Sequence, residues 1–353
     1  MLLENKTVLV TGGTGSLGKV LVRRLLSGEK GTPRKIIVYS RDEAKQHEMR
    51  VGYLHKRATT DEIIYRNFMQ TLEFRIGDVR DYGALCTAVR QADVIVNAAA
   101  LKQVPSCEYF PNEALLTNCV GASNLVRAIN ENGYPVQVVV GVSTDKACKP
   151  INVMGMSKAL QERIFIAANI LNPSTRFIGV RYGNVLASRG SVIPLFHEQI
   201  RNGGPVTITV PEMTRFLLSL DSAVDTIFAA LEGASPGEIY VPNAPSATVL
   251  NVARALIGDR GTEVRIVGIR PGEKMHEVLV SEEEVHHCVR RGDFYAIRAM
   301  LPELTGTPGP NALNREFSSA DNVLDLAATE TLLRRHRLMI DDPLVYDDGE
   351  LLR

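Results

Sequence analysis

The sequence predicts an α/β fold, a Rossmann-type doubly wound parallel sheet with a smaller C-terminal substrate-binding lobe. The first observation is a series of short apolar runs separated by helical patterns, at residues 7–10, 35–39, 72–76, 94–98, 136–142 and 177–180. Such continuous apolar runs are typical of parallel strands that are covered on both faces. The second observation is the segment from Gly12 to Gly18, which joins the first run to a helical pattern. A strand, a glycine-rich turn and a helix in this order open many doubly wound sheets.

The regular alternation weakens after Asn184, and connections rich in glycine and proline appear. We therefore expect a Rossmann domain at residues 1–184, a substrate-binding lobe at 185–300 with some strands returning to the first domain, and a C-terminal extension at 301–353. The charged stretch 49–70 lengthens the second crossover, and we interpret it as a solvated helical insertion or a subunit contact. A helical pattern runs from Leu324 to Leu338.

The composition excludes several classes of protein. Among 353 residues, 40 basic and 40 acidic side chains cancel, so neither a nucleic acid nor an anionic membrane is an expected partner. No apolar run approaches the roughly 20 residues of a membrane helix, and the first residues lack the pattern of a signal peptide. Five scattered cysteines argue against a disulfide framework. We expect a cytoplasmic protein with a small ligand, no membrane insertion and no metal site.

The glycines at positions 12, 15 and 18 predict a dinucleotide site. Gly12 permits a tight turn, Gly15 lets the backbone approach a pyrophosphate, and Gly18 lets the helix pack closely on the strand. The phosphates then lie at a helix N-terminus. Tight turns also select glycine, so the position of the motif between a strand and a helix carries the prediction.

The end of the second strand indicates the cofactor. Ser40 and Arg41 stand where an enzyme that prefers NAD often has a carboxylate, and a guanidinium suits a 2′-phosphate. We therefore predict NADP, with NAD possible; the alternative is that Arg41 is a surface charge paired with Asp42 or Glu43. Asp78 and Val79 would hold the adenine edge. The predicted cofactor contacts are Gly12, Thr14, Gly15, Ser16, Leu17, Gly18, Ser40, Arg41, Asp42, Lys45, Asp78, Val79, Ala98, Ala99, Ala100, Lys102, Asn118, Lys158 and Val185.

A hydroxyl, a carboxylate and an amine stand side by side at Thr144, Asp145 and Lys146, where the fifth apolar run ends. Open α/β sheets bind their ligands at the carboxyl ends of strands, so these residues are candidates for proton transfer. The alternative is a solvated surface pair. Lys158 follows Met154 by four positions, where short-chain dehydrogenases carry a Tyr-x-x-x-Lys pair. A thioether cannot replace the phenol in proton transfer, so either the protein is inactive or the proton chemistry has moved.

The chain resembles the extended short-chain dehydrogenase/reductases, and within them the UDP-N-acetylglucosamine 4,6-dehydratases of bacterial surface-sugar synthesis. The similarity covers most of residues 5–298, and the capsule-pathway branch shares the Met-Gly-x-Ser-Lys pattern. The segments that carry it are 11–18, 40–43, 77–81, 98–108, 143–147, 150–152, 181–185, 188–194, 213–216 and 270–274.

The resemblance implies a reaction in which C4 of the sugar is oxidised, water is eliminated across C5 and C6, and the hydride returns to C6. It implies Lys146 as the C5 base and Asp145 as the acid at C6, which requires a neutral Lys146 and a protonated Asp145 during elimination, through opposed pKa shifts. C5 inversion, a UDP-N-acetylglucosamine partner and a homo-oligomer, either a dimer or a hexamer, are expected. The implied substrate contacts are Lys102, Thr144, Asn184, Arg189, Arg215, Arg270 and Glu273.

Because Met154 cannot take the proton of the C4 hydroxyl, we expect Thr144 to hold the C4 oxygen and pass the proton toward Asp145 or a water. Lys158 keeps its position on the nicotinamide ribose. Three alternatives stay open: a dehydratase that retains C5, a nucleotide-sugar 4-epimerase, and a non-catalytic protein that binds NADP or a sugar nucleotide. An epimerase needs no elimination at C6, so the adjacent Asp145 and Lys146 favour the dehydratase.

Overall fold

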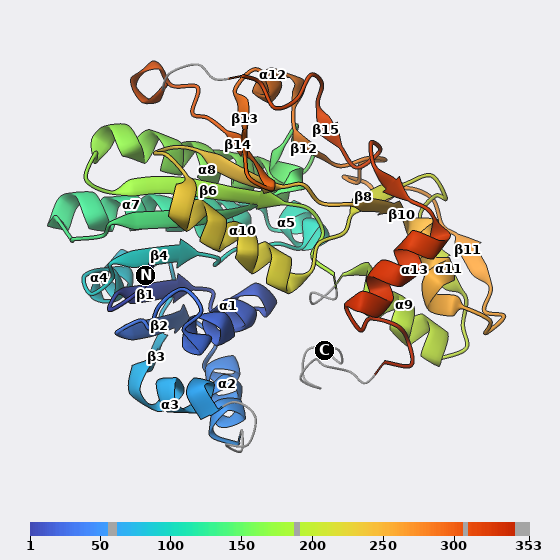
Figure 1. Cartoon of the computed structure of the whole chain (residues 1–353), viewed down its shortest axis with the longest axis horizontal. Helices are drawn as coiled ribbons and strands as arrows, with labels where there is room; N and C mark the ends of the chain where they lie inside the picture. The colour runs from blue at the N-terminus through green and yellow to red at the C-terminus, as the bar shows by residue number, and fades with distance from the viewer. Residues whose placement is uncertain (56–61, 187–190, 306–309, 343–353) are drawn as a thin grey trace.

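The computed structural model describes residues 1–55, 62–186, 191–305 and 310–342 (Figure 1). A nine-stranded sheet forms its centre. In spatial order the strands are β13 (Cys288–Arg291), β14 (Phe294–Ile297), β9 (Ile239–Pro242), β6 (Arg176–Tyr182), β5 (Val138–Thr144), β4 (Val94–Asn97), β1 (Thr7–Thr11), β2 (Lys35–Ser40) and β3 (Leu72–Ile76). The strands from β9 to β3 are parallel, and β14 and β13 add to the sheet antiparallel. The predicted fold class is confirmed.

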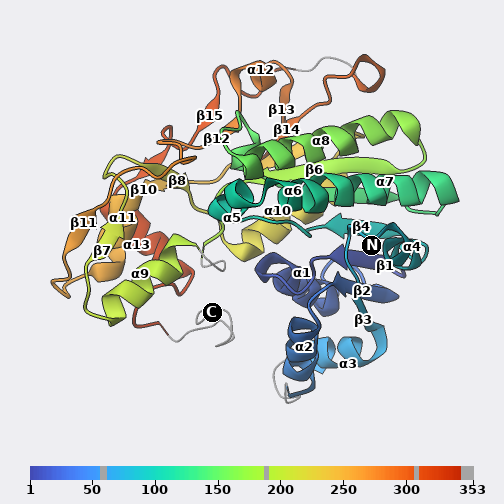
Figure 2. The same ribbon diagram turned by 180° about the vertical axis from the view of Figure 1, so that it is seen from behind.

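Helices cover both faces of this sheet (Figure 2). On one face lie α1 (Ser16–Ser27), α3 (Glu62–Thr71) and α10 (Leu220–Gly233), and on the other lie α4 (Tyr82–Val89), α7 (Gly121–Asn132) and α8 (Val153–Leu171). The strand order reverses direction between β1 and β4, because β2 and β3 extend the sheet one way and β4 to β6 the other. Ligands of doubly wound sheets bind outside the carboxyl ends of the strands at such a switch point.

The helical insertion is more deeply packed than the sequence predicts. Helices α2 (Glu43–His55) and α3 do form there, but Met49, Tyr53 and Phe68 are buried in the main core. The rings of Tyr53 and Phe68 stack with centroids 5.2 Å apart. These three side chains therefore stabilise the sheet edge, whereas Leu54 and Met69 of the same stretch are exposed. A subunit contact through this stretch stays a prediction.

After β6, the segments that do not return to the large sheet build a smaller cluster of elements to one side of it (Figure 1). Three small sheets follow β6. The first has the spatial order β16 (Val323–Leu324), β10 (Ser246–Thr248) and β8 (Thr214–Phe216). The other two are pairs, β11 (Val264–Ile266) with β7 (Val206–Ile208) and β12 (Val278–Val280) with β15 (Phe317–Ser318). The helices there are α9 (Val192–Arg201), α11 (Val249–Ile257) and α13 (Leu326–Arg335). The short turns α12 (Glu282–Val285) and η3 (Pro302–Leu304) pack instead against the core of the large sheet. Phe196, Val252, Leu256 and Leu333 share one apolar core.

Segments beyond residue 300 are part of this cluster. Strand β16 pairs with β10, β15 pairs with β12, and α13 packs against α11. The helix predicted at Leu324 to Leu338 is confirmed as α13. The domain boundaries at residues 184 and 300 stay predictions. In the described part of the chain, every helix is too short or too polar to cross a bilayer.

Candidate active site

A cavity of about 780 Å³ opens at the carboxyl ends of the central strands. Its walls come from the glycine-rich loop after β1, from the ends of β2, β4, β5 and β6, from α8, and from residues 270–277 of the smaller cluster. Thus the cavity lies at the switch point of the sheet, where the fold class leads us to expect a ligand.

The turn after β1 fits a dinucleotide. Gly12 has φ of +68°, and a Cβ added there would meet the backbone of Ala99 at 2.8 Å. Gly18 approaches Gly13 so closely that a Cβ would lie 2.5 Å from its backbone. Gly15 precedes α1 without a side-chain hydrogen bond to cap the helix. The amides at the start of α1 are therefore not capped by a side chain, as a phosphate site requires.

The side chains after β2 and β3 form a charged rim. The hydroxyls of Thr14 and Ser40 lie 2.9 Å apart. The side chain of Arg41 is 57% exposed, and its Nη1 lies 3.6 Å from Asp78 Oδ2. Burial opposes ionisation of Asp78, but the guanidinium of Arg80 holds the pKa of that carboxyl below its usual value. Asp78 is therefore an anion at neutral pH that Arg80 already pairs.

The loop after β4 is fixed from behind by Asn118. Its amide group accepts a hydrogen bond from Leu101 N at 2.8 Å and donates to Leu101 O at 3.0 Å and to Ser157 Oγ at 2.9 Å. Asn118 is fully buried and does not line the cavity. Its side chain therefore shapes the wall formed by Ala98 to Lys102 and is not itself at the surface that a cofactor would contact. This segment leads into α5 (Val104–Tyr109), α6 (Pro111–Ala114) and the π-helical turn η1 (Leu115–Val120), which carries Asn118.

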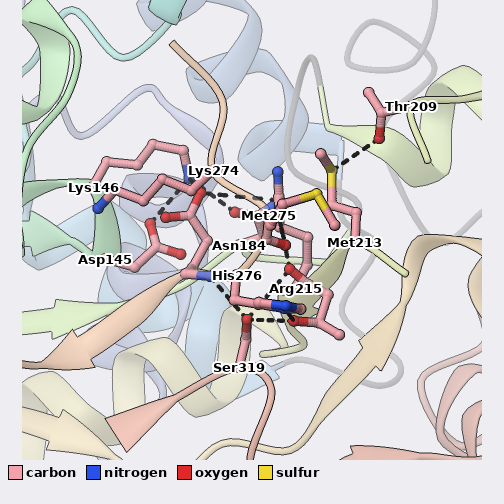
Figure 3. A network of polar contacts seen from close by, with 12 residues as sticks. Asp145, Lys146, Asn184, Thr209, Met213, Arg215, Lys274, Met275, His276 and Ser319 are labelled. Carbon is pink, nitrogen blue, oxygen red and sulfur yellow. Dashed lines mark hydrogen bonds and ion pairs between the residues drawn. The ribbon is translucent and has the colours of Figure 1, made fainter. Parts of the chain in front are cut away.

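Thr144, Asp145 and Lys146 form one hydrogen-bonded group, of which Figure 3 shows Asp145 and Lys146. Strand β5 ends at Thr144, and the chain turns into the short helix η2 (Asp145–Ala147). Thr144 Oγ1 donates to Asp145 Oδ1 at 2.9 Å, and Lys146 Nζ donates to the same oxygen at 3.0 Å. Lys146 also donates to Asn184 Oδ1 at 3.2 Å. Asp145 is fully buried, and its second oxygen has no hydrogen-bond partner among the described residues.

In the empty protein the neighbours of Lys146 favour its charged form, whereas the expected neutral amine belongs to the elimination step. Burial by itself would lower the pKa of the ammonium group, but the carboxylates of Asp145 and Glu277 outweigh burial and raise the pKa above its usual value. Glu277 Oε1 lies 3.4 Å from Lys146 Nζ. In the resting protein Lys146 is therefore a cation, because two carboxylates surround it.

Helix α8 presents Met154 and Lys158 to the cavity one turn apart. Gly155 lets the helix rest directly on η2, since a Cβ there would lie 2.2 Å from the carbonyl oxygen of Lys146. Met154 packs with Cys107 and Ala114. Lys158 Nζ donates to Val142 O and to Gln161 Oε1, and burial lowers the pKa of this lysine to about 8.

The far wall holds most of the predicted substrate contacts. Asn184, Arg215, Arg270 and Glu273 all line the cavity, as do Lys102 and Thr144. Arg215 is 9% exposed and donates to the carbonyl oxygens of Thr214 and Met275, at 2.7 and 3.3 Å. The predicted contact Arg189 lies outside the described residues.

Several cavity residues were not predicted from the sequence. Six buried side-chain atoms have no hydrogen-bond partner in the described chain, and five of them belong to residues of the cavity wall: Thr117 Oγ1, Tyr182 OH, Ser191 Oγ, Glu273 Oε2 and Glu277 Oε2. The sixth is Asp145 Oδ2. Unsatisfied buried polar atoms are uncommon in folded proteins. Their concentration here indicates that the cavity is built for a polar ligand. Glu277 in particular has no local sequence signal, because an isolated carboxylate before a short apolar run is typical of a surface residue.

The comparisons with known proteins agree with this fold. The family described as "Polysaccharide biosynthesis protein" matches residues 8–299. Two proteins named UDP-glucose 4-epimerase, from Rickettsia conorii and Rickettsia bellii, are 45% and 43% identical over 298 residues, covering 83% of this chain and 83% of each relative.

Two solved structures are similar in shape. The structure of Pen from Bacillus thuringiensis has a TM-score of 0.85 and 29% identity, and the match covers 96% of this chain and all of that one. DesIV from Streptomyces venezuelae, a dTDP-glucose 4,6-dehydratase, has a TM-score of 0.66 at 23% identity over 94% of this chain and 98% of its own, which shows the fold alone. With its matched length and its curated relatives, the chain belongs to the polysaccharide biosynthesis protein family.

Proposed function

We propose that the chain is an NADP-dependent UDP-N-acetylglucosamine 4,6-dehydratase that inverts C5. The observation that carries the proposal is the contact between Asp145 and Lys146 at 3.0 Å in the wall of the central cavity. An elimination needs a group that removes the C5 proton and a group that protonates the leaving hydroxyl. The relatives named UDP-glucose 4-epimerase and the family description support a sugar nucleotide as the substrate.

The nicotinamide, when bound, accepts a hydride from the sugar and later returns it. The uncapped start of α1 would hold the pyrophosphate, and Thr14, Ser40 and Arg41 would receive the adenosine ribose. Arg41 is free to turn toward a 2′-phosphate, because Arg80 keeps Asp78 paired in its absence. This arrangement supports NADP over NAD.

The hydrogen bond from Thr144 to Asp145 supplies a path for the C4 proton. Thr144 would hold the C4 oxygen and pass the proton to Asp145, and Asp145 would then give it to the hydroxyl that leaves C6. One proton thus moves from the C4 hydroxyl to the departing water through Asp145. The path needs no phenol at position 154, where Met154 fills an apolar pocket.

Tyr182 offers a competing phenol. It ends β6 opposite Thr144 in the strand register and lines the cavity, and its hydroxyl has no hydrogen-bond partner in the described residues. Burial raises the pKa of Tyr182 well above its usual value. A phenol that stays protonated is a poor proton acceptor. We therefore expect Thr144→Val to slow C4 oxidation by about 100-fold, the lower end of what a positioned proton-transfer group contributes, and Tyr182→Phe to have a much smaller effect.

Single-turnover reduction of enzyme-bound NADP by UDP-N-acetylglucosamine, followed by absorbance, measures that step. An equal loss of the C4 oxidation rate in both variants would indicate that the C4 proton passes through Tyr182. Unchanged turnover in Thr144→Val would remove Thr144 from the mechanism.

A 4-epimerase acting on UDP-glucose is the second candidate, because the curated relatives carry that name. The two functions share the first hydride step and differ at C5 and C6. An epimerase leaves the C5 proton and the C6 hydroxyl in place, so it needs neither the acid nor the base. The buried Asp145 and its contact with Lys146 therefore favour the dehydratase.

Proton NMR of the purified protein with UDP-N-acetylglucosamine in deuterated water separates the candidates. We expect a C6 methyl signal, deuterium at C5, and ring couplings of the inverted sugar. A parallel incubation with UDP-glucose tests the epimerase. Formation of UDP-galactose without any C6 methyl product would reject the dehydratase, and inertness toward both nucleotides in a protein that binds NADP would indicate a sensor.

A further inference from the structure

Lys146 lies between two carboxylates, and the mechanism above uses one of them. Asp145 Oδ1 is 3.0 Å from Lys146 Nζ and Glu277 Oε1 is 3.4 Å from it. Glu277 is 1% exposed and lines the cavity. A buried carboxylate beside a candidate base influences the protonation of that base directly.

The backbone holds Glu277 firmly in place. Its N–H donates to Ser319 Oγ at 2.9 Å, and its carbonyl oxygen accepts from Ser319 N at 2.8 Å. Strand β12 begins at the next residue, and Arg181 Nη1 donates to Leu279 O at 2.9 Å. Ser319 also contacts Thr214 Oγ1, which in turn contacts His276 Nδ1 (Figure 3). The side chain of Glu277 therefore starts from a fixed point at the cavity wall.

The groups that face Glu277 are Asp145 and Lys146 on η2, Arg215 on β8 and Lys274 on its own segment. Arg215 Nε lies 4.0 Å from Oε1, so that oxygen faces both cations. Oε2 has no hydrogen-bond partner in the described chain. A buried carboxylate with one unsatisfied oxygen is poorly solvated, and burial followed by the charge of Asp145 raises the pKa of Glu277.

We propose that Glu277 takes the proton that Lys146 must lose before Lys146 acts as the C5 base, so that the two residues work as one proton-sharing pair. The Nζ–H bond breaks, an O–H bond forms at Oε1, and the ammonium–carboxylate pair becomes an amine and a carboxylic acid. The neutral amine then removes the C5 proton. This inference rests on the proposed dehydratase function.

A filled cavity favours the transfer. Substrate that excludes water removes the solvation that stabilises an ion pair, and a neutral pair has little solvation to lose. If the pyrophosphate of the substrate pairs with Arg215, it also withdraws a cation that favours the charged form of Glu277. The empty protein then holds Lys146 as a cation, and the occupied one turns it into a base.

Glu277 and Asp145 would hold different protons. Asp145 shares Oδ1 between Thr144 and Lys146, which places it on the path from the C4 hydroxyl to the leaving water. In the described chain Glu277 forms neither a hydrogen bond nor an ion pair with Thr144, and it faces Lys146 from the other segment. Because Asp145 and Glu277 accept different protons, Asp145 can act as an acid while Lys146 acts as a base in the same turnover. Glu277 is therefore a positioning residue that acts through Lys146.

The first test compares the pH dependence of C5 deuterium exchange in the wild type and in Glu277→Gln. An amide keeps the shape of the side chain but cannot take the proton, so Lys146 must lose it to solvent. We expect the wild-type rate to be nearly flat between pH 7 and 9. The variant rate should be at least tenfold lower at pH 7 and rise by about tenfold per pH unit until it passes the pKa of Lys146.

Glu277→Asp keeps a carboxylate and should restore the flat profile, even at a lower rate. Glu316→Gln, which removes the partly buried partner of Lys149, is the matched control and should behave as the wild type. A rate in Glu277→Gln that is lowered equally at every pH would assign Glu277 a structural role only. Wild-type rates in this variant would also overturn the proposal.

A second measurement needs no substrate, so it separates this inference from the proposed function. Carbamylation of Lys146 by cyanate, followed by mass spectrometry with Lys6 as the internal reference, reports the neutral amine. Removing the Glu277 charge lowers the pKa of Lys146, so at pH 8 we expect several-fold faster labelling in Glu277→Gln. Equal labelling would show that the two groups are not coupled and would reject the pair. If the wild type gives no C6 methyl product, the dehydratase function fails, and the proton-transfer role of Glu277 is rejected with it even where labelling shows coupling.

Discussion

Around Gly12 the cavity is walled mainly by backbone and small side chains, whereas around Lys146 it is walled by charged side chains from distant segments. The first region, here called the glycine end, depends on close approaches such as Gly12 to Ala99. The second, the lysine end, combines Asp145 and Lys146 from η2 with Arg215 from β8 and Glu277 before β12. The glycine end is thus a fixed shape, and the lysine end is a balance of charges.

Because the two regions are built differently, different kinds of substitution damage them. A shape built from backbone fails when an atom is added, because the backbone cannot move aside. A balance of buried charges fails when one partner is removed, because the remaining charge is left uncompensated. The following predictions use these two modes of failure, beginning with the largest expected effect.

Lys146→Met tests the lysine end. It removes the proposed base and leaves Asp145 and Glu277 without a shared cation, so we expect C5 exchange and turnover to fall by about 1,000-fold or more. Binding of NADP, measured by titration calorimetry, should change by less than about twofold, since the glycine end is untouched. Turnover above one tenth of the wild-type rate would remove Lys146 from the chemistry.

Gly12→Ala tests the glycine end. The new Cβ would lie 2.8 Å from the backbone of Ala99 at a residue with φ of +68°, so both shape and backbone conformation oppose it. We expect unfolding to become easier by about 1–3 kcal/mol, the usual cost of such strain, and NADP affinity to fall by about 100-fold.

The matched control is Gly52→Ala, an exposed position in α2 where an added Cβ meets nothing within 4 Å. Alanine is the better helix former, so that variant should be more stable by up to about 1 kcal/mol. Thermal unfolding and cofactor titration measure both variants. Unchanged NADP affinity in Gly12→Ala would show that this turn does not cradle the cofactor.

The two ends also differ in how far the sequence predicts them. Gly12, Gly15, Gly18 and Ser40 lie in short contiguous motifs whose local conformation fixes their relation, so their place at the cavity follows from the strand and helix pattern. Asp145 and Lys146 could be predicted for the same reason, because they end a buried strand. For these residues, the conformation of the neighbouring chain is enough to predict their position at the cavity.

Glu277 could not be predicted in this way. It reaches Lys146 because Ser319, 42 residues further along the chain, bonds its backbone on both sides. The raised pKa of Lys146 could not be predicted for the same reason, because Glu277 is one of the two carboxylates that raise it. The burial of Met49, Tyr53 and Phe68 could not be predicted either, because the charged neighbours of these residues obscure the apolar face of the helices. Long-range packing decides all three cases.

Arg41→Ala tests whether an exposed charge contributes to cofactor binding at the glycine end, in addition to the shape formed by the backbone. Arg41 is 57% exposed and 3.6 Å from Asp78, which Arg80 also pairs, so its loss should leave the fold intact. We expect NADP affinity to fall by about tenfold, the scale of one charged hydrogen bond to a phosphate, with NAD affinity unchanged. Arg23→Ala, which removes a surface partner of Asp221, is the control. Equal losses for both cofactors would show that Arg41 does not recognise the 2′-phosphate, and no loss for either would favour the alternative that Arg41 is a surface charge.

The smallest predicted effect joins the two ends through Lys158, a cation on α8 beside the proposed nicotinamide position. Burial lowers its pKa to about 8, and the charges of Glu162 and Cys119 offset only part of this shift. An anionic cofactor binds the protonated form better, so its affinity should be full below pH 8 and fall above it as Lys158 loses its proton. The 2′-phosphate titrates near pH 6, outside this range. We expect NADP to bind about threefold more weakly at pH 9 than at pH 7.5. This loss is smaller than the roughly tenfold loss of protonated Lys158 that one pH unit above its pKa can produce. Lys158→Arg, whose guanidinium stays charged, should remove the dependence. An affinity that is flat in the wild type would mean that the Lys158 charge does not contribute to binding, and the glycine end would then hold the cofactor by shape alone.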